Sequence, residues 1–459
     1  MSGSAFWHPF ADMSSVAGHD FVLASGEGAY VLDTSGRRYL DATAGLWYCN
    51  IGHGRRELGE AAARQMATLA SYSNFGDLTT GPTLLLADRL AALSGLPDAK
   101  VFFTSGGSDA VDTAVKLVRR YWALLDRPER TIIITRNRSY HGMHVAGTAL
   151  AGIPANRDGY GHLDMGVRNC AWDDVEDLAR VIEECGPEHV AAFFCEPIIG
   201  AGGVYAPPEG YLEAARALCR EHRILFVADE VITGYGRAGA MFGSLRWDVQ
   251  PDLLLTAKGL TSGYLPMGAV IVTGSVAEPF WSRPGFVWRH GYTYSGHATA
   301  AAVAMANLDI LEGERLIERV TDHQSEMRSA LTSLIEHDLV EAVRAGVGLL
   351  AAVQLRPDAL AERPDLGLVL VKQARDRGMI TRMLADGSVQ LSPAFVVTKD
   401  ELRTIATVLD ESLAAVGSTR TARPSLNVNL LPDQTRDESG GFESTDAHLR
   451  AEVPPHHVA

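Results

Sequence analysis

Two charged residues follow short apolar segments and could act together on one ligand. Residues 224–228, Ile-Leu-Phe-Val-Ala, are typical of a buried strand and are followed by Asp229. Residues 253–257 have the same character and are followed by Lys258. Ligands of open α/β sheets bind beyond the carboxyl ends of the strands, so we predict that this carboxylate and this amine face a common ligand.

The surroundings of Lys258 favour a reactive amine. It lies between an apolar segment and Gly259, with Gly263 close behind, and therefore not on a charged surface. Desolvation lowers the pKa of a lysine and lets it act as a nucleophile that forms a Schiff base with a carbonyl group. Pyridoxal phosphate (PLP) uses one such lysine together with a carboxylate beside its pyridinium nitrogen. The alternative is that Asp229 and Lys258 are two solvated surface charges.

The sequence around these two residues resembles a known enzyme family. Residues 229–239 are Asp-Glu-Val-Ile-Thr-Gly-Tyr-Gly-Arg-Ala-Gly, and residues 253–266 are Leu-Leu-Leu-Thr-Ala-Lys-Gly-Leu-Thr-Ser-Gly-Tyr-Leu-Pro. This pattern resembles the fold-type I PLP enzymes, specifically the class III aminotransferases. Within that class it is most similar to the ω-amino acid and amine:pyruvate transaminases. The resemblance extends over roughly residues 5–415.

The resemblance implies both a fold and a reaction. The fold is α/β, with a large domain around a mostly parallel sheet and a smaller α+β domain. The reaction transfers an amino group from an ω-amino acid or a primary amine to a keto acid such as pyruvate, by a ping-pong mechanism. Lys258 would hold PLP in a Schiff base and move the proton, and Asp229 would keep the pyridine nitrogen protonated.

A glycine-rich turn is the predicted phosphate site. Gly106, Gly107 and Ser108 lie between an expected strand at 101–103 and an expected helix at 110–125. Small residues let backbone N–H groups approach an anion, and a helix N-terminus adds positive charge. An ordinary helix N-cap is the alternative. By resemblance the turn binds the cofactor phosphate, although the family's Ser-Gly-Ser-Glu-Ala is Gly-Gly-Ser-Asp-Ala here, which predicts an altered cofactor affinity.

The resemblance assigns further residues to the cofactor. Tyr140 follows the strand expected at 131–135, where its aromatic face can stack on a planar ring and contact the substrate; plain packing is the alternative. Val231 would pack on the other face of that ring, and His141 belongs to the same cofactor-binding group. Glu196 ends a third apolar segment and would line the site, where it can pair with an arginine. A structural ion pair is the alternative for Glu196.

The resemblance also assigns residues to the substrate and to a second subunit. Thr293, in the motif His-Gly-Tyr-Thr-Tyr-Ser-Gly-His at 290–297, would reach the partner's cofactor phosphate. This implies a homodimer, or a tetramer, with composite active sites, and Phe75 would face the partner's pocket. Trp47 would shape the substrate pocket. Arg382 would bind the carboxylate of the keto acid, a task that suits its planar fork, with a surface salt bridge as the alternative.

Composition limits the classes of partner and compartment. The chain has 459 residues, of which 46% are apolar, and a net charge of −15 at pH 7, which argues against nucleic acid or an anionic membrane as a partner. The five cysteines are scattered without a Cys-x-x-Cys pair, so neither a disulfide framework nor a structural metal site is expected. No apolar segment approaches the ~20 residues of a membrane helix. The N-terminus lacks the features of a secretory signal, and we expect a cytoplasmic protein.

Four regions are expected along the chain. They are an N-terminal segment of the small domain at 1–70, a large PLP-binding α/β domain at 71–312, a C-terminal small α+β domain at 313–416 and a disordered polar tail at 417–459. In the large domain, strands alternating with helices predict a mostly parallel sheet covered on both faces. The strands are expected at 101–103, 131–135, 190–195, 224–228, 253–257 and 268–273.

Other functions remain open at this point. A PLP-dependent aminomutase of the same fold would move the amino group within one molecule and need no keto acid. Diaminopelargonate-type aminotransferases favour paired tryptophans where this chain has Leu-Trp-Tyr at 46–48. A PLP-binding regulator without turnover is disfavoured by the intact Lys258 and Asp229. Residues 234–239 match the dinucleotide motif Gly-x-Gly-x-x-Gly, but no convincing helix follows them.

Overall fold

The structure is a computed structural model that describes residues 4–163 and 165–418. The described part of the chain divides into two units, one within residues 4–18 and the other within residues 19–418. In the described part of the first unit, Asp12 caps the short helix α1 (Met13–Val16) by accepting a hydrogen bond from Ser14 N. Residues 417 and 418 still belong to a helix, and the rest of the predicted tail lies outside the described residues.

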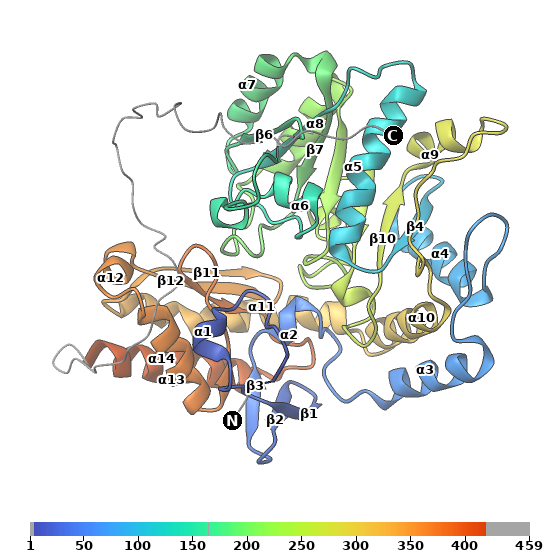
Figure 1. The fold of residues 1–459 in the computed structure, drawn as a ribbon. Helices are drawn as coiled ribbons and strands as arrows, with labels where there is room; N and C mark the ends of the chain where they lie inside the picture. Colours follow the sequence, from blue (N-terminus) through green and yellow to red (C-terminus); the bar gives the residue numbers. More distant parts are fainter. Residues whose placement is uncertain (1–3, 164, 419–459) are drawn as a thin grey trace, which may run out of the picture. The chain divides into compact units, whose positions relative to one another are not determined.

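A seven-stranded sheet is the centre of the second unit (Figure 1), in the order β4-β10-β9-β8-β7-β5-β6. Strand β10 alone runs opposite to the other six strands, which confirms the prediction of a mostly parallel sheet. The strands are β4 (Lys100–Thr104), β5 (Ile132–Arg136), β6 (Val167–Cys170), β7 (Val190–Cys195), β8 (Leu225–Asp229), β9 (Leu253–Thr256) and β10 (Gly268–Val272).

Helices cover both faces of this sheet. Because side chains alternate along a strand, Phe194 and Val227 pack toward α5 (Gly107–Leu124), whereas Phe193 and Phe226 pack with the apolar residues of two other helices. These helices are α7 (Val175–Cys185) and α8 (Tyr211–Glu221). Strands buried on both faces need continuous apolar sequence, and this is why the segments before Asp229 and Lys258 lack polar alternation.

There are two smaller sheets, and one of them combines strands from opposite ends of the chain. The four-stranded sheet β1-β2-β3-β13 pairs β3 with β13 in parallel, and β11-β12-β14 form an antiparallel sheet. The strands are β1 (Leu23–Glu27), β2 (Tyr30–Asp33), β3 (Arg38–Asp41), β11 (Val340–Val347), β12 (Leu350–Leu355), β13 (Met379–Ile380) and β14 (Ser388–Leu391). The domain boundaries predicted from the sequence stay a prediction.

The remaining helices lie between these strands along the chain or, for the last of them, after the final strand. They are α2 (Ala44–Trp47), α3 (Arg56–Leu69), α4 (Gly81–Ser94), α6 (Val145–Leu150), α9 (Gly274–Trp281), α10 (Ala298–Gly313), α11 (Leu316–Thr332), α12 (Pro357–Glu362), α13 (Leu366–Asp376) and α14 (Lys399–Ser418). None of the helices in the described ranges has both the length and the hydropathy needed to span a bilayer. Within those ranges, no cluster of three or more His, Cys, Asp or Glu residues could hold a metal ion.

Candidate active site

A cavity of about 440 Å³ lies where several strands of the large sheet end, a size typical of small-molecule sites. Six of the predicted residues reach it from the ends of β5, β7, β8 and β9 or from the turns that follow these strands. The predicted residues that line the cavity are Gly106, Gly107, Ser108, Tyr140, His141, Glu196, Asp229, Val231 and Lys258. Residues that were not predicted also line it, among them Thr261, Gly263, Leu265, Pro266 and Met267.

Lys258 follows β9 by two residues and begins a single 3₁₀ turn. Its backbone lies in the left-handed region, with φ of 43°, a conformation that costs free energy in a non-glycine residue and is concentrated at functional sites. Burial lowers the pKa of the Lys258 amine to about 8, and the nearby carboxylates of Asp229 and Glu196 oppose this shift. The amine is therefore partly neutral near physiological pH, as a nucleophile or proton acceptor must be.

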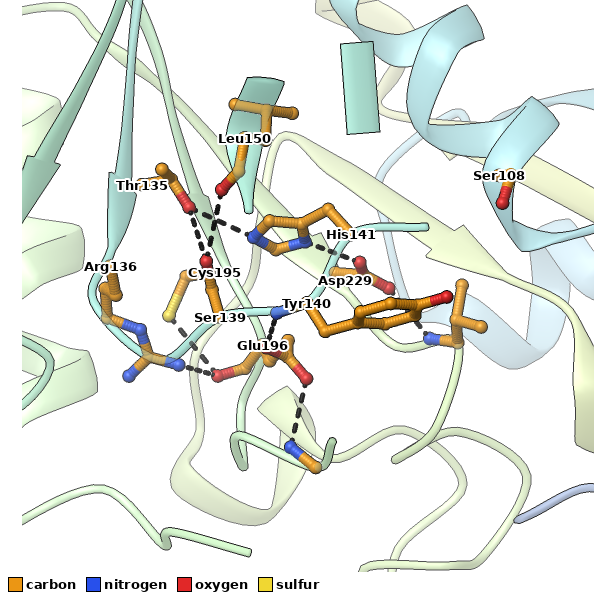
Figure 2. A network of polar contacts seen from close by, with 12 residues as sticks. Ser108, Thr135, Arg136, Ser139, Tyr140, His141, Leu150, Cys195, Glu196 and Asp229 are labelled. Atoms are coloured by element: carbon orange, nitrogen blue, oxygen red, sulfur yellow. Dashed lines mark hydrogen bonds and ion pairs between the residues drawn. The ribbon is translucent and has the colours of Figure 1, made fainter. Parts of the chain in front are cut away.

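Asp229 is the last residue of β8 and is held by a buried polar network (Figure 2). Its Oδ2 lies 2.7 Å from His141 Nδ1, and its Oδ1 accepts a hydrogen bond from Val231 N at 3.1 Å. The other ring nitrogen of His141, Nε2, lies 3.1 Å from Thr135 Oγ1. With Nε2 accepting from the threonine hydroxyl, Nδ1–H donates to Asp229 and fixes the direction of the carboxylate.

Glu196 is fully buried, but its carboxylate does not form the ion pair with an arginine that was expected. Its Oε1 accepts from Tyr140 N at 2.9 Å and its Oε2 accepts from Gly200 N at 3.0 Å. Arg136 donates instead to the backbone carbonyl of Glu196 (Figure 2). Burial raises the pKa of Glu196, and the nearby charge of Asp229 adds to this rise. Backbone donors therefore satisfy this carboxylate, and it holds the turn that carries the Tyr140 ring.

The phosphate turn is built by close backbone approach. Helix α5 begins at Gly107, earlier than the predicted Ala110, so the turn itself forms the helix N-terminus. A Cβ atom on Gly107 would lie 2.8 Å from Val231 Cγ1, and one on Gly142 would lie 2.5 Å from Ser108 Oγ. Glycine is therefore required where these segments meet. The first turn of α5 presents backbone N–H groups, together with the Ser108 hydroxyl, to the cavity.

Trp47 and Arg382 approach Lys258 from other segments of the chain. The centroid of the buried Trp47 ring lies 5.9 Å from Lys258 Nζ and 4.4 Å from Arg382 Cζ. Burial lowers the pKa of Arg382 to about 10, so the guanidinium is still cationic at neutral pH. Arg382 makes no ion pair with any residue in the described ranges, which disfavours the surface salt bridge as an explanation for this residue.

Phe75 and Thr293 do not line this cavity. Both are exposed in the single chain, Phe75 to 56%. They nevertheless lie close together, because a Cβ atom on Gly291 would be 3.0 Å from the Phe75 ring and Asn74 Nδ2 donates to Ser295 O at 2.7 Å. The two residues assigned to a partner subunit are thus on one surface.

The other sequence motif, at residues 234–239, forms turns, and the only helical segment soon after it is the 3₁₀ turn at Ser244–Trp247. A dinucleotide site needs a helix N-terminus at this point, so the motif carries no such function. Thr135 and Ser139 were not predicted as site residues, and their hydroxyl oxygens lie 3.1 Å apart beside His141. Their polar side chains next to the end of an apolar strand were the available signal.

These residues together fit PLP. The helix N-terminus with Ser108 suits its phosphate, the buried Asp229 suits its pyridinium nitrogen, and the desolvated, partly neutral amine of Lys258 suits its aldehyde. Tyr140 and Val231 supply a flat aromatic surface and an apolar surface for the ring.

Comparisons with known proteins agree with this chemistry. The aminotransferase class-III family model matches residues 13–413. A putrescine–pyruvate aminotransferase of Pseudomonas aeruginosa is 39% identical, over 86% of this chain and 91% of its own length. A mitochondrial gamma-aminobutyrate transaminase of Oryza sativa is 34% identical, over 90% of this chain and 85% of its own length.

Solved structures show the same fold. An (S)-enantioselective omega-transaminase from Thermomicrobium roseum superposes with a TM-score of 0.86 at 40% identity, over 89% of this chain and 96% of that one. A PLP-bound amine transaminase from an uncultivated Pseudomonas species gives 0.85 at 35% identity, over 90% and 99%. The chain therefore belongs to the class-III aminotransferases, which are PLP-dependent enzymes with the fold-type I architecture.

Proposed function

We propose that this aminotransferase transfers the amino group of a primary amine or an ω-amino acid to pyruvate or a similar keto acid. The observation that carries the proposal is that a desolvated amine, Lys258, and a cation without an ion-pair partner in the described ranges, Arg382, both lie close to the Trp47 ring. The apolar ring suits amines without a carboxylate, and the guanidinium suits a keto acid. The relatives named for putrescine with pyruvate and for gamma-aminobutyrate support this substrate class.

Each residue of the cavity has a distinct task in this proposal. PLP, when bound, supplies an electron sink for the carbon that loses its proton. Lys258, once its amine is free, would take the proton from that carbon and deliver it to C4′ of the cofactor, the carbon that is to carry the amino group. Asp229, oriented by His141, places a negative charge where the ring nitrogen must stay protonated. Ser108 and the N-terminus of α5 would hold the phosphate. Glu196 binds the backbone N–H of Tyr140 and so positions the Tyr140 side chain against the pyridine ring of the cofactor.

The Arg382 fork would bind the keto-acid carboxylate beside Lys258. Charge-assisted hydrogen bonds to a planar fork are stronger than neutral ones and select a carboxylate geometrically. Amines without a carboxylate would instead contact the Trp47 ring.

We also propose a homodimer in which Thr293 completes the partner's phosphate site and Phe75 faces the partner's pocket. The exposed apolar side chains around these residues, Tyr72 at 55%, Leu78 at 50% and Tyr294 at 62%, support a covered surface. Sizing by light scattering distinguishes dimer, tetramer and monomer, and a monomer would contradict this part of the proposal. The cysteines are all free thiols, which suits the reducing cytoplasm as its compartment.

The function is tested by product formation. Purified protein with added PLP should form alanine from pyruvate when supplied with putrescine, β-alanine or 1-phenylethylamine, and should form none when either substrate is omitted. Rearrangement of an amino acid without a keto acid would instead identify an aminomutase, an alternative that the transaminase relatives do not favour. Absence of alanine with every donor and keto acid would contradict the proposal.

The low pKa of Lys258 predicts the pH dependence of cofactor attachment. Only the neutral amine reacts, so the rate at which the apoprotein acquires the visible absorbance of bound PLP should rise about tenfold per pH unit below about 8 and level off above it. A free lysine derivative, measured in parallel, corrects for the ionisation of PLP itself. A rate that keeps rising toward the ordinary lysine pKa of about 10.4 would contradict the desolvation of Lys258.

A further inference from the structure

A buried glutamine contacts Arg382, the arginine to which the proposed function assigns the keto-acid carboxylate. Gln390 lies in the edge strand β14 and is fully buried. Its backbone N–H donates to Arg382 O at 2.9 Å, so the two residues are neighbours across a short hairpin, where side chains on one face meet. The side-chain oxygen of Gln390 accepts from Arg382 Nε at 2.6 Å. The hairpin therefore fixes both the backbone and the side chain of Arg382 to the same residue.

The orientation of the Gln390 amide follows from its partners. Arginine Nε–H can only donate, so the amide oxygen must face it. The amide nitrogen lies 2.7 Å from Ser392 Oγ, and that hydroxyl donates its own hydrogen to Thr43 O at 3.2 Å. The Ser392 oxygen is thus available as an acceptor for Gln390. If the Gln390 amide were flipped, its NH2 group would face the Nε–H of Arg382, and two donors would oppose each other.

These contacts form a closed path through Arg382, Gln390, Ser392 and the segment that carries Trp47. Thr43 directly precedes α2, the segment that carries Trp47, and the Trp47 ring packs on the Arg382 guanidinium at 4.4 Å. Arg382 is therefore held on one side by the aromatic ring and at Nε by Gln390, and Gln390 is tied through Ser392 to the segment of Trp47. The arrangement keeps the guanidinium close to Lys258.

The contacts of Arg382 leave one edge of the guanidinium for a ligand. Neither Nη atom hydrogen-bonds to any residue within 4–163 or 165–418. With Nε engaged by Gln390, a carboxylate meets the edge formed by Nη1 and Nη2. A leucine would fill the Gln390 position without burying a polar amide, so packing alone does not explain this residue.

We propose that Gln390 is a positioning residue that holds Arg382 in the site and so sets the preference for carboxylate-bearing substrates over amines and aldehydes that lack a carboxylate. This rests on the proposed function, in which Arg382 binds the keto-acid carboxylate. Without Gln390, the buried Nε–H loses its acceptor and the guanidinium gains by turning toward water. The enzyme then binds pyruvate and alanine more weakly, while an amine such as 1-phenylethylamine meets less obstruction.

The test compares Gln390→Met with Gln354→Met. Gln354 is also a buried glutamine of the same sheet and hydrogen-bonds to the same hairpin at Asp386, but it does not contact Arg382. We expect Gln390→Met to raise KM for pyruvate and for alanine roughly tenfold or more. KM for 1-phenylethylamine should be unchanged or lower, and kcat should change little. Gln354→Met should leave the ratio of these KM values as in the wild type.

A double-mutant cycle separates positioning from a general structural effect. If Gln390 acts through Arg382, then Gln390→Met should change KM for pyruvate very little in an Arg382→Leu background. Ser392→Ala removes the partner of the Gln390 amide nitrogen and should shift the same KM ratio in the same direction by a smaller factor. This variant keeps the test open if Gln390→Met does not fold.

The outcomes distinguish this inference from the proposed function. Wild-type protein that forms no alanine from any amine and pyruvate would overturn the proposed function. Active wild-type protein whose KM ratio is unaltered by both Gln390→Met and Ser392→Ala would overturn the role of Gln390 alone. An Arg382→Leu enzyme with unaltered KM for pyruvate would also overturn it, because Gln390 would then have no carboxylate site to position.

Discussion

Replacement of Lys258 by alanine should reduce turnover roughly 10⁴-fold or more, the upper range for loss of an acid–base group, because this amine both attaches the cofactor and moves the proton. Burial lowers the pKa of this amine to about 8, and the carboxylates of Asp229 and Glu196 lie near it. Turnover is measured as alanine formed from pyruvate and an amine, together with the visible absorbance of the protein in the presence of PLP. Both should disappear.

The matched control is Lys372→Ala. Lys372 is exposed on α13 and pairs with Asp376 one turn away, so its loss removes a lysine without touching the cavity. Surface pairs of this kind contribute little to stability. Activity and absorbance should equal those of the wild type. If Lys258→Ala instead retained both properties, another residue would have to hold the cofactor, and the assignment of the whole cavity would be wrong.

Asp229→Asn should reduce turnover per bound cofactor roughly 10²- to 10³-fold, the range seen when a preorganised electrostatic partner is removed. The amide has nearly the shape of the carboxylate, and its single oxygen can still accept from Val231 N. Its NH2 group then faces His141 Nδ1, which must accept as the other tautomer of the ring. The variant therefore keeps the shape of the side chain and loses the negative charge. Without that charge the ring nitrogen is no longer kept protonated, and electrons leave the substrate carbon less readily.

Asp252→Asn is the control for this variant. Asp252 is also a partly buried carboxylate beside the sheet, but it precedes β9 and binds Arg216 at 2.6 Å and Phe226 N at 2.8 Å, at the opposite end of the strands. Its loss should lower the free energy of unfolding and leave turnover per bound cofactor unchanged. Equal losses of turnover in Asp229→Asn and Asp252→Asn would show that the charge facing the ring nitrogen has no special role.

The strand ends could be predicted from the sequence because a strand that is buried on both faces has a continuous apolar sequence. Leu225–Asp229 and Val190–Cys195 are buried along their entire lengths, so their apolar segments end where the backbone leaves the sheet. Asp229, Glu196 and Lys258 are therefore visible as charges at such ends. Strand β6 was missed because Arg168 and Asn169 are exposed, which removes both the apolar run and the alternation.

The substrate side of the site could be predicted only by resemblance. Trp47 lies in a four-residue segment in which Ala44, Gly45 and Trp47 all have positive φ, and local sequence preference does not predict such a backbone. Its contact with Arg382 depends on the parallel pairing of β3 with β13, two strands separated by most of the chain. The role of Gln390 could not be predicted from the sequence, because a single polar residue in a strand is usually on a solvated face.

The central claim, that Lys258 and Asp229 serve a cofactor that carries the amino group between two substrates, is tested most directly by absorbance during one cycle. Protein saturated with PLP is mixed with an amine alone, and pyruvate is added after excess amine has been removed. We predict that the amine abolishes the visible band and that pyruvate restores it with one equivalent of alanine per bound cofactor. A band that no amine alters, or one that pyruvate does not restore, would contradict the transfer of the amino group through this site.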